Sequence, residues 1–361
     1  MRRRSFLTHA AAVSGAAALA APALSQGRQE VRLATTWPRD FPGLGTGAQR
    51  VADRITLTSE GRLTVKLFAA GELVPAFDSF DAVANGDAEM YHGADYYWQG
   101  KHKGFNFFTS VPLGLTAKEL NSWVLFGGGQ QLWDQLSGEF GIKPFLAGNT
   151  GVQMGGWFRN PVTSLDDIRG LRMRIPGLGG ETLRQLGAEP VSLPGGEIFA
   201  ALQDGRIDAT EWVGPYNDLA FGLQKFLKTY MYPGFHEPGT AIALGINKAW
   251  WDSLPEADQL LIQACAETEN DMMIAEYNAN NGASMRELAA EHDVTVTPFP
   301  REVWDEIARV GDQVVADVAK GDLLGARIYN SYQRFRRSVA GWSEISDQAY
   351  LRARADAFGT G

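Results

Sequence analysis

Cysteine is almost absent from this chain of 361 residues, which contains only Cys265. A single cysteine excludes a disulfide within the chain, even in an oxidising compartment. The segment around it, LLIQACAE, has the composition of an apolar helix, so we expect Cys265 to lie in the core. The fold must therefore be stabilised by the burial of apolar side chains.

Histidine is also rare, and the sequence has no recognisable catalytic or metal-binding motif. Four of the five histidines follow the N-terminal segment: His92, His102, His236 and His292. No two of them have the spacing of zinc ligands. The sequence also lacks a G-x-S-x-G elbow, a P-loop and a dinucleotide-binding fingerprint. Because nothing in it indicates a nucleophile, we predict that the protein is not an enzyme.

Basic residues are outnumbered by acidic ones, 33 against 42, which gives a formal net charge of −9. This balance argues against nucleic acid as a partner. Beyond the N-terminal segment, no apolar run approaches the roughly 20 residues that a membrane span needs. We therefore expect a mature protein that is not embedded in a membrane.

Residues 1–25 predict export to the periplasm. They read MRRRSFLTHAAAVSGAAALAAPALS, a basic start followed by an alanine-rich stretch and the small-x-small ending ALS. The arginines at 3–4, followed by SFL, resemble a twin-arginine signal. An ordinary secretory leader is the alternative, and both predict export. Cleavage after Ser25 would leave 30 basic residues against 42 acidic ones, a net charge of −12.

Strand and helix patterns alternate along the mature chain and predict an α/β fold in two lobes. The first round, with strands in 30–37 and 61–73, predicts a largely parallel sheet, and 142–161 predicts a pair of strands. About 335 mature residues exceed the size that one core supports. The segment 239–292 predicts a strand and then a helix long enough to brace both lobes.

These patterns divide the chain as follows. We assign 26–150 to lobe I, completed by part of 240–322. Residues 151–239 form lobe II, and 240–322 supply crossing strands and the long helix. A helical extension occupies 323–361.

The segment RGLRMRIPG, residues 169–177, places two arginines at alternate positions of a short strand. Leu171, Met173 and Ile175 point to one face of such a strand, and Arg172 and Arg174 point to the other. An exposed arginine face is the ordinary interpretation. Alternatively, one arginine lines a cleft and binds a carboxylate or phosphate with its planar fork of donors.

A second informative segment, DGRIDATEWVGPYND, predicts a strand with Glu211 at its carboxyl end. Ligands of open α/β sheets bind at that edge. A buried carboxylate there needs a partner. Glu211 either forms a plain ion pair with Arg174, or carries a cation while Arg174 holds the carboxylate of a ligand. An amide such as Gln153 and a backbone carbonyl would add oxygen ligands suited to sodium or calcium.

The stretch from 169 to 212 resembles the central signature of the solute-binding proteins of tripartite ATP-independent periplasmic (TRAP) transporters. It contains a G-L-R-x-R-x-P strand, a G-A-x-P-V turn, an E-x-x-x-A-L-Q-x-G helix and an acidic strand end, in that order. The segments ATTWP, GADYYW, GVQMGGWF and ATEWVGPYND resemble the branch that binds small 2-oxoacids or 2-hydroxyacids, such as pyruvate or lactate, with a cation. The resemblance implies a two-lobed periplasmic-binding-protein-like fold with a long bridging helix and a helical C-terminal extension.

The resemblance also implies roles for individual residues. Arg174 would form the salt bridge to the substrate carboxylate, which leaves Arg172 on an ordinary strand face. Gln153, Glu211 and the carbonyl of Trp212 would ligate a sodium or calcium ion that also contacts the substrate.

Further residues of this branch lie around the ligand. One of Tyr96 and Tyr97 would place its hydroxyl near it, and because alternation lets only one face the cleft, we favour Tyr97. Trp37 and Phe199 are candidates for the walls, with core packing as the alternative for Phe199. Glu237 either orients the site or is a solvated loop acid.

The family works with separate membrane permease subunits, to which this chain would deliver its ligand. The C-terminal extension would support a homodimer, and its apolar residues have the spacing of one helix face: Tyr329, Tyr332, Phe335, Val339 and Trp342. The alternative is a helix that packs on its own body. Two rival functions are a metal-dependent enzyme acting on the same oxoacids, for which a metal-bound Glu211 would be a poor base, and a ligand sensor without a transport role.

Overall fold

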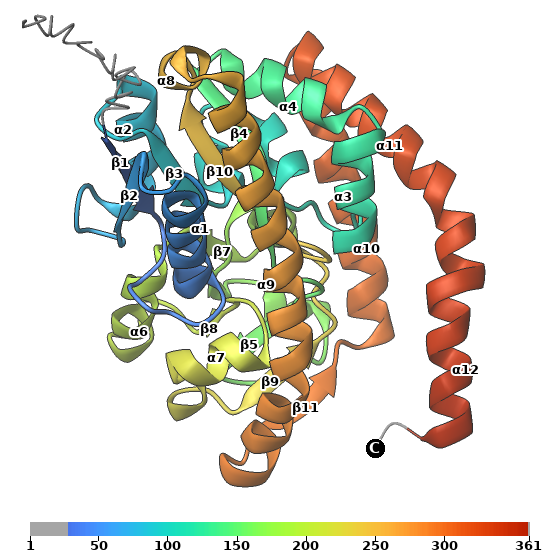
Figure 1. Cartoon of the computed structure of the whole chain (residues 1–361). Helices are drawn as coiled ribbons and strands as arrows, with labels where there is room; N and C mark the ends of the chain where they lie inside the picture. The colour runs from blue at the N-terminus through green and yellow to red at the C-terminus, as the bar shows by residue number, and fades with distance from the viewer. Residues whose placement is uncertain (1–27, 360–361) are drawn as a thin grey trace, which may run out of the picture.

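Two β-sheets, each covered by helices, form the two halves of the molecule (Figure 1). The structure, a computed structural model, describes residues 28–359, so the export signal predicted at 1–25 lies outside the described residues. Within the described part of the chain, no helix has both the length and the hydropathy of a membrane span.

The first sheet has the strand order β2-β1-β3-β10-β4. Its strands are β1 (Gln29–Thr35), β2 (Leu63–Phe68), β3 (Met90–Gly93), β4 (Ile142–Asn149) and β10 (Ala241–Asn247). The helices of this half are α1 (Leu44–Thr58), α2 (Ser79–Asn85), α3 (Ala117–Phe126), α4 (Gly129–Gly138) and α8 (Lys248–Ser253).

The second sheet has the order β11-β9-β5-β8-β6-β7. Its strands are β5 (Gly156–Phe158), β6 (Arg172–Arg174), β7 (Glu189–Val191), β8 (Ala209–Thr210), β9 (Thr229–Tyr232) and β11 (Thr295–Pro298). The helices of this half are α5 (Gly177–Gln185), α6 (Gly195–Gln203), α7 (Pro215–Phe221) and α10 (Arg301–Asp317).

The first sheet is largely parallel, as predicted, and so is the second, because one strand in each, β10 and β5, runs against the others. In the first sheet β1 is parallel to β2 and β3, but β10 is antiparallel to β3 and β4. The reason is connectivity, because β10 enters the first sheet only after the chain has returned from the second. The pair of strands predicted in 142–161 exists as β4 and β5, but these strands belong to different sheets.

The chain therefore crosses between the sheets at 150–155 and again at 233–240, and the two crossing segments lie against each other. The backbone amide of Gly234 donates to the backbone carbonyl of Gln153 at 2.9 Å, and the backbone amide of Gln153 donates to the backbone carbonyl of Glu237 at 3.1 Å. A Cβ at Gly234 would lie 2.5 Å from the Gln153 carbonyl oxygen, so the close approach requires glycine there. These crossings bring Gln153 and Glu237 to the junction of the two sheets.

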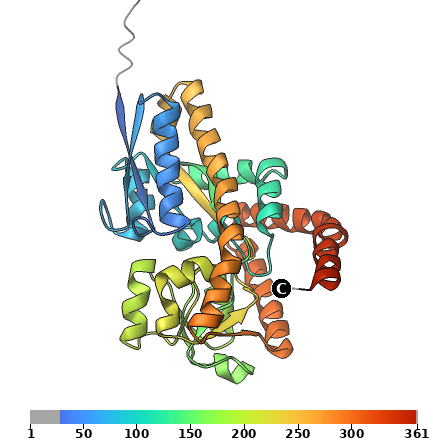
Figure 2. The same cartoon turned by 60° about the horizontal axis from the view of Figure 1, so that its bottom comes forward.

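A third connection is the predicted long helix, α9 (Glu256–Glu291), which has 36 residues. It packs against β4 and α1 of the first half and α7 of the second, and Figures 1 and 2 show it running along both. Cys265 lies buried on its inner face, as predicted. Glu269 is buried on the same helix and is held by Arg50 of α1 at 2.6 Å. One rigid helix thus braces both halves.

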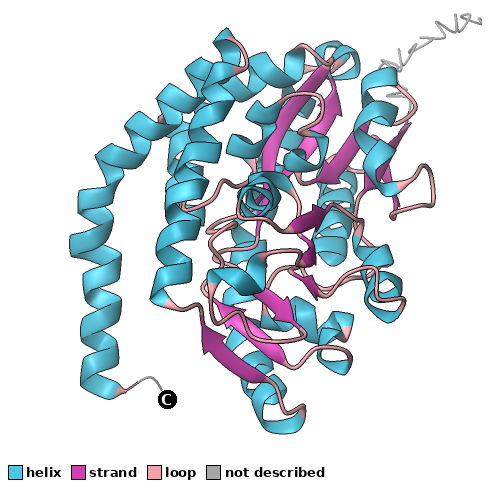
Figure 3. Ribbon diagram, turned by 180° about the vertical axis from the view of Figure 1, so that it is seen from behind, coloured by secondary structure: helices cyan, strands magenta, loops and turns pink. Residues whose placement is uncertain are grey.

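The C-terminal extension begins with α11 (Leu323–Ser343), which packs on the first half, and ends with α12 (Ala349–Phe358). Leu324, Ile328 and Tyr332 are buried, and the Tyr332 hydroxyl accepts a bond from the Leu115 amide at 2.6 Å. Most of the apolar face predicted for a dimer therefore packs on its own body. In contrast, α12 has no buried residue and stands away from the body (Figures 1 and 3).

Candidate functional site

The two alternate arginines of β6 have opposite environments. Arg172 is 43% exposed and pairs with Asp208, its Nη2 lying 2.7 Å from Oδ1. The side chain of Arg174 is only 1% exposed. The ordinary interpretation of an exposed arginine thus holds for Arg172, whereas Arg174 points into the interior between the sheets.

The Arg174 guanidinium is held on three of its sides. Its Nε donates to the Leu193 carbonyl at 3.1 Å, and its Nη1 donates to the Glu211 carboxylate and, at 3.4 Å, to the Glu211 carbonyl. Its Cζ atom lies 5.1 Å from the centroid of the Trp212 ring, within cation–π range. Burial lowers the pKa of Arg174, but the charge of Glu211 together with Tyr97 and Tyr96 more than offsets this, and the pKa is raised. The least occupied nitrogen is Nη2, for which the described residues provide one hydrogen bond, to the Tyr97 hydroxyl at 3.4 Å.

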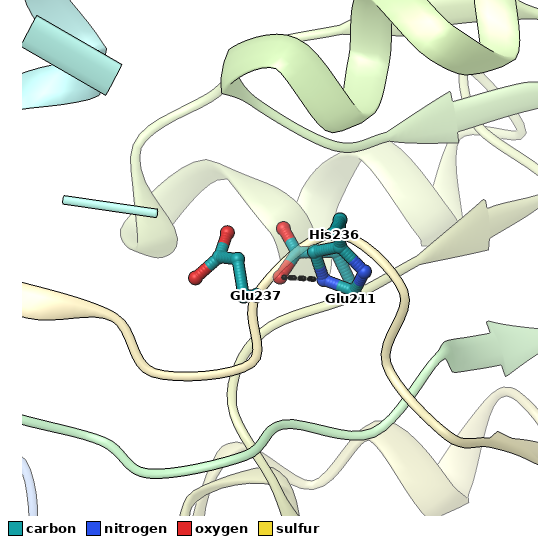
Figure 4. Close-up of side chains that lie close together, drawn as sticks. All are labelled: Glu211, His236 and Glu237. Atoms are coloured by element: carbon teal, nitrogen blue, oxygen red, sulfur yellow. Dashed lines mark hydrogen bonds and ion pairs between the residues drawn. The ribbon is translucent and has the colours of Figure 1, made fainter. Parts of the chain in front are cut away.

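Glu211 follows β8 directly and lies at the carboxyl end of that strand, as the sequence indicated. One carboxylate oxygen accepts from Arg174, and the other lies 3.3 Å from Nε2 of His236. Glu211, His236 and Glu237 are all buried, and each offers a ligand atom within 4.8 Å of the others (Figure 4). The sequence did not indicate His236 as a site residue, because its partner Glu211 is 25 positions away and only the fold brings the two together.

Gln153 and Glu237 form the second part of the same cluster. The Gln153 amide nitrogen donates to the Glu237 carboxylate at 2.8 Å and to the hydroxyls of Thr150 and Thr240 at 3.0 and 3.2 Å. Burial, and secondarily the charge of Glu211, raises the pKa of Glu237 to about 7. Glu237 is therefore a buried group at the junction, and the alternative of a solvated loop acid was wrong.

A small cavity lies beside these groups, with an empty volume of about 220 Å³. It is lined by Trp37, Leu44, Tyr96, Tyr97, Thr150, Gln153, Trp212, Val213, Thr240 and Ile242. The space that these side chains leave is small, so only a compact ligand would fit there. Its walls are aromatic and aliphatic, with the amide of Gln153 and the hydroxyls of Thr150 and Thr240 among them; Arg174 reaches the lining through Tyr97, whose hydroxyl lies 3.4 Å from Nη2.

Two expectations about the walls need correction. Tyr96 and Tyr97 both line the cavity, because they lie in a short helical turn, Asp95–Trp98, and not in an alternating strand. The hydroxyl of Tyr97 is the one that reaches Arg174, and burial raises its pKa to about 12, which keeps it a neutral donor. Phe199 neither lines the cavity nor lies in the core: it is 42% exposed and contacts Phe226 on the surface of α6.

The donor set at this junction fits a hard cation. Among the described residues, Oε1 of Gln153 is buried without a hydrogen-bond partner, and its amide nitrogen is already committed to Glu237. Glu211 and Glu237 add two buried carboxylates, for which a single arginine supplies the only permanent positive charge in the cluster. Carboxylate, amide and carbonyl oxygens are the ligands that sodium and calcium prefer. The side-chain oxygens of Gln153 and Glu211 therefore have the chemistry of ligands for such an ion.

Comparison with known proteins gives this geometry a context. Residues 33–322 match the model of the bacterial extracellular solute-binding proteins of family 7, the DctP family. A monocarboxylate 2-oxoacid-binding periplasmic protein of Nostoc sp. is 36% identical over 358 residues, covering 97% of this chain and 98% of that protein.

Solved structures of TRAP solute-binding proteins resemble this chain in both sequence and fold. A TRAP solute-binding protein from Pseudoalteromonas atlantica with bound sodium and pyruvate is 38% identical, with a TM-score of 0.87, over 90% of this chain and 99% of that one. One from Bordetella bronchiseptica, a dimer with calcium and picolinate, is 34% identical, with a TM-score of 0.89, over 91% of this chain and 97% of that one. This chain therefore belongs to the family 7 extracellular solute-binding proteins, the DctP-type receptors of TRAP transporters.

Proposed function

We propose that the protein is a periplasmic receptor that binds a small 2-oxoacid such as pyruvate, or a 2-hydroxyacid such as lactate, together with a sodium or calcium ion. The observation that carries this proposal is the buried Arg174. Its Nη1 is paired with the Glu211 carboxylate, and its Nη2 points towards the Tyr97 hydroxyl. The small volume of the cavity and the ligands of the related structures support the same class of compound.

In this proposal the ligand carboxylate binds at Nη2 of Arg174 and at the Tyr97 hydroxyl. Both are donors, and charge-assisted bonds of this kind are about twice as strong as neutral ones. Trp37 and Trp212 form the walls, and Tyr96 completes the aromatic lining. Low polarity around the ligand strengthens each of these electrostatic contacts.

The cation would be held by Gln153, Glu211 and the Trp212 carbonyl. When bound, it supplies positive charge for the keto or hydroxyl oxygen next to the ligand carboxylate. Glu237 orients the Gln153 amide through its 2.8 Å hydrogen bond, so that the amide oxygen faces away from Glu237 and stays free. The chain's own residues therefore set both the charge and the direction of the oxygen ligands.

We further propose that the two halves close on the ligand, with the first sheet in lobe I and the second in lobe II. Aromatic side chains meet across the junction: Phe41 lies 6.1 Å from Trp212 and 4.7 Å from Phe221, and Trp37 lies 6.2 Å from Trp212, between ring centroids. Asn217 of α7 also donates to the Pro42 carbonyl at 2.9 Å. Such contacts favour the closed state and exclude water from the ligand.

The receptor is proposed to present its closed form to separate TRAP membrane permease subunits after export by a twin-arginine-type signal. The family supports a binding role, and we propose that the protein is not an enzyme. Pyruvate that stays unchanged by NMR during long incubation would separate a receptor from an enzyme. Loss of uptake when the permease is deleted would separate a transport receptor from a sensor.

A homodimer is proposed through the end of the C-terminal extension. Because most of α11 packs on its own body, the exposed apolar residues at its end and beyond it are the candidates for the contact: Trp342, Ile345, Tyr350 and Leu351. The related Bordetella bronchiseptica protein is a dimer. Light scattering that shows only a monomer would refute this part of the proposal.

The binding proposal is tested by calorimetry on chelator-treated protein, residues 26–361. Pyruvate, lactate and succinate are titrated with and without added sodium or calcium. We expect tight binding of a monocarboxylate that requires a cation, and no binding of succinate, because the cavity is small. Absence of binding to any 2-oxoacid or 2-hydroxyacid would refute the proposal.

A further inference from the structure

We propose that His236 is a positioning residue of the cation site, which keeps the Glu211 carboxylate from closing completely onto Arg174. The inference rests on the function proposed above, and it concerns a residue that the sequence did not indicate. Its basis is the contact geometry of Arg174, Glu211 and His236 and the packing of the imidazole; Figure 4 shows His236 beside Glu211.

Glu211 is shared between two partners. Its Oε1 accepts from Nη1 of Arg174, and its Oε2 lies 3.3 Å from Nε2 of His236, with all three side chains only 1% exposed. Since a carboxylate oxygen only accepts, Nε2 must carry the hydrogen. A carboxylate offers about four lone-pair sites, so these two contacts leave others free for a cation.

Burial of the His236 imidazole is unfavourable unless its Nε2 makes a compensating hydrogen bond. Its Nδ1 is buried and has no hydrogen-bond partner among the described residues, and an unpaired buried acceptor destabilises the folded state. An apolar side chain would fill the same space without that cost. The imidazole is also fixed: its ring centroid lies 5.1 Å from that of Phe235, and a Cβ at Gly179 of α5 would lie 2.5 Å from the His236 Cβ.

Arginine and carboxylate prefer a bidentate arrangement with two parallel hydrogen bonds. Without His236, Oε2 of Glu211 would be free to take the second position on the Arg174 guanidinium. That movement would withdraw a carboxylate oxygen from the cation and would occupy a donor that the ligand carboxylate needs. Residues that hydrogen-bond to a metal ligand and fix its orientation typically contribute about 10- to 100-fold to metal affinity.

The test measures the cation concentration that gives half-maximal binding at saturating pyruvate. We expect His236→Leu to raise this midpoint by about 10- to 100-fold. His236→Gln places an amide N–H near the position of Nε2, so it should bring the midpoint back to within a few-fold of the wild type. Phe145→Leu in β4 is the control, since it changes a buried ring that packs on Trp251 and has no part in the proposed site; it should lower the melting temperature and leave the midpoint unchanged.

A cation midpoint of His236→Leu equal to that of the wild type would overturn the inference, as would equal shifts in the Leu and Gln variants. If His236→Leu does not fold, His236→Gln is compared with His236→Asn, whose shorter amide cannot reach Glu211. We then expect the Asn midpoint to be at least about tenfold higher, and equal midpoints would overturn the inference. Cation-independent binding by the wild type would instead refute the proposed function itself.

Discussion

Replacement of Arg174 by methionine, with Arg172→Ala as the control, is the most direct test of the site. The two arginines lie on one short strand and each pairs with a carboxylate, yet one pair is buried and the other is exposed. Arg174→Met removes the charge and the fork of donors while it keeps most of the side-chain volume. Arg172→Ala removes an ion pair of the same chemistry at the surface.

The structure sets the expected magnitudes. Removing one partner of a buried ion pair costs about 3–5 kcal/mol of stability, because Glu211 would remain as an uncompensated charge. Loss of the donor to the ligand should weaken pyruvate binding by about 2–5 kcal/mol, which corresponds to about 30-fold or more. The exposed pair of Arg172 with Asp208 contributes only about 0–1 kcal/mol, and binding should not change.

Urea unfolding monitored by fluorescence measures the first quantity, and calorimetric titration with pyruvate and cation measures the second. Arg174→Lys should bind with intermediate affinity, since it keeps the charge but cannot replace the bonds to Leu193, Glu211 and the ligand together. The reasoning fails if Arg172→Ala weakens binding as much as Arg174→Met does, or if Arg174→Met binds pyruvate with wild-type affinity.

Three further predictions concern other parts of the fold. Phe41→Ala removes two ring contacts across the junction and should weaken pyruvate binding about tenfold through faster release, measured by stopped-flow fluorescence; an unchanged release rate would contradict the closure proposal. Burial raises the pKa of Asp95 to about 7, so the folded state binds its proton more tightly than the unfolded state. The stabilisation from the protonated Asp95 carboxyl is complete below about pH 4 and is lost as the pH rises towards 7. Between pH 5 and 8 the unfolding free energy of the wild type should therefore fall by roughly 2–3 kcal/mol more than that of Asp95→Asn. Parallel pH profiles of the two proteins would refute the assignment to Asp95. Deletion of 344–361 leaves the buried contacts of α11 intact and should convert a dimer to a monomer in light scattering, and a truncated protein that remains dimeric would place the contact elsewhere.

Much of the site chemistry could be predicted from residue types and their order. The alternation in 171–175 identified Arg172 and Arg174 as neighbours on one strand face, and the break after Trp212 placed Glu211 at a strand end. The apolar and small residues of 256–291, without a helix stop, predicted the long helix that braces both halves. These features depend on local periodicity, which a chain carries in any context.

Tertiary structure decided the rest, because it depends on contacts between distant segments. It made Arg174 buried and Arg172 exposed, since only Arg174 lies where the second sheet meets the first. It turned 95–98 into a helical turn, so both tyrosines line the cavity. It also brought His236 to Glu211 by a chain crossing that no local pattern records. The sequence by itself determined which chemical groups were available and on which elements they lie; the crossings between the two sheets decided which groups meet, because strand periodicity specifies a face and not the partner across it.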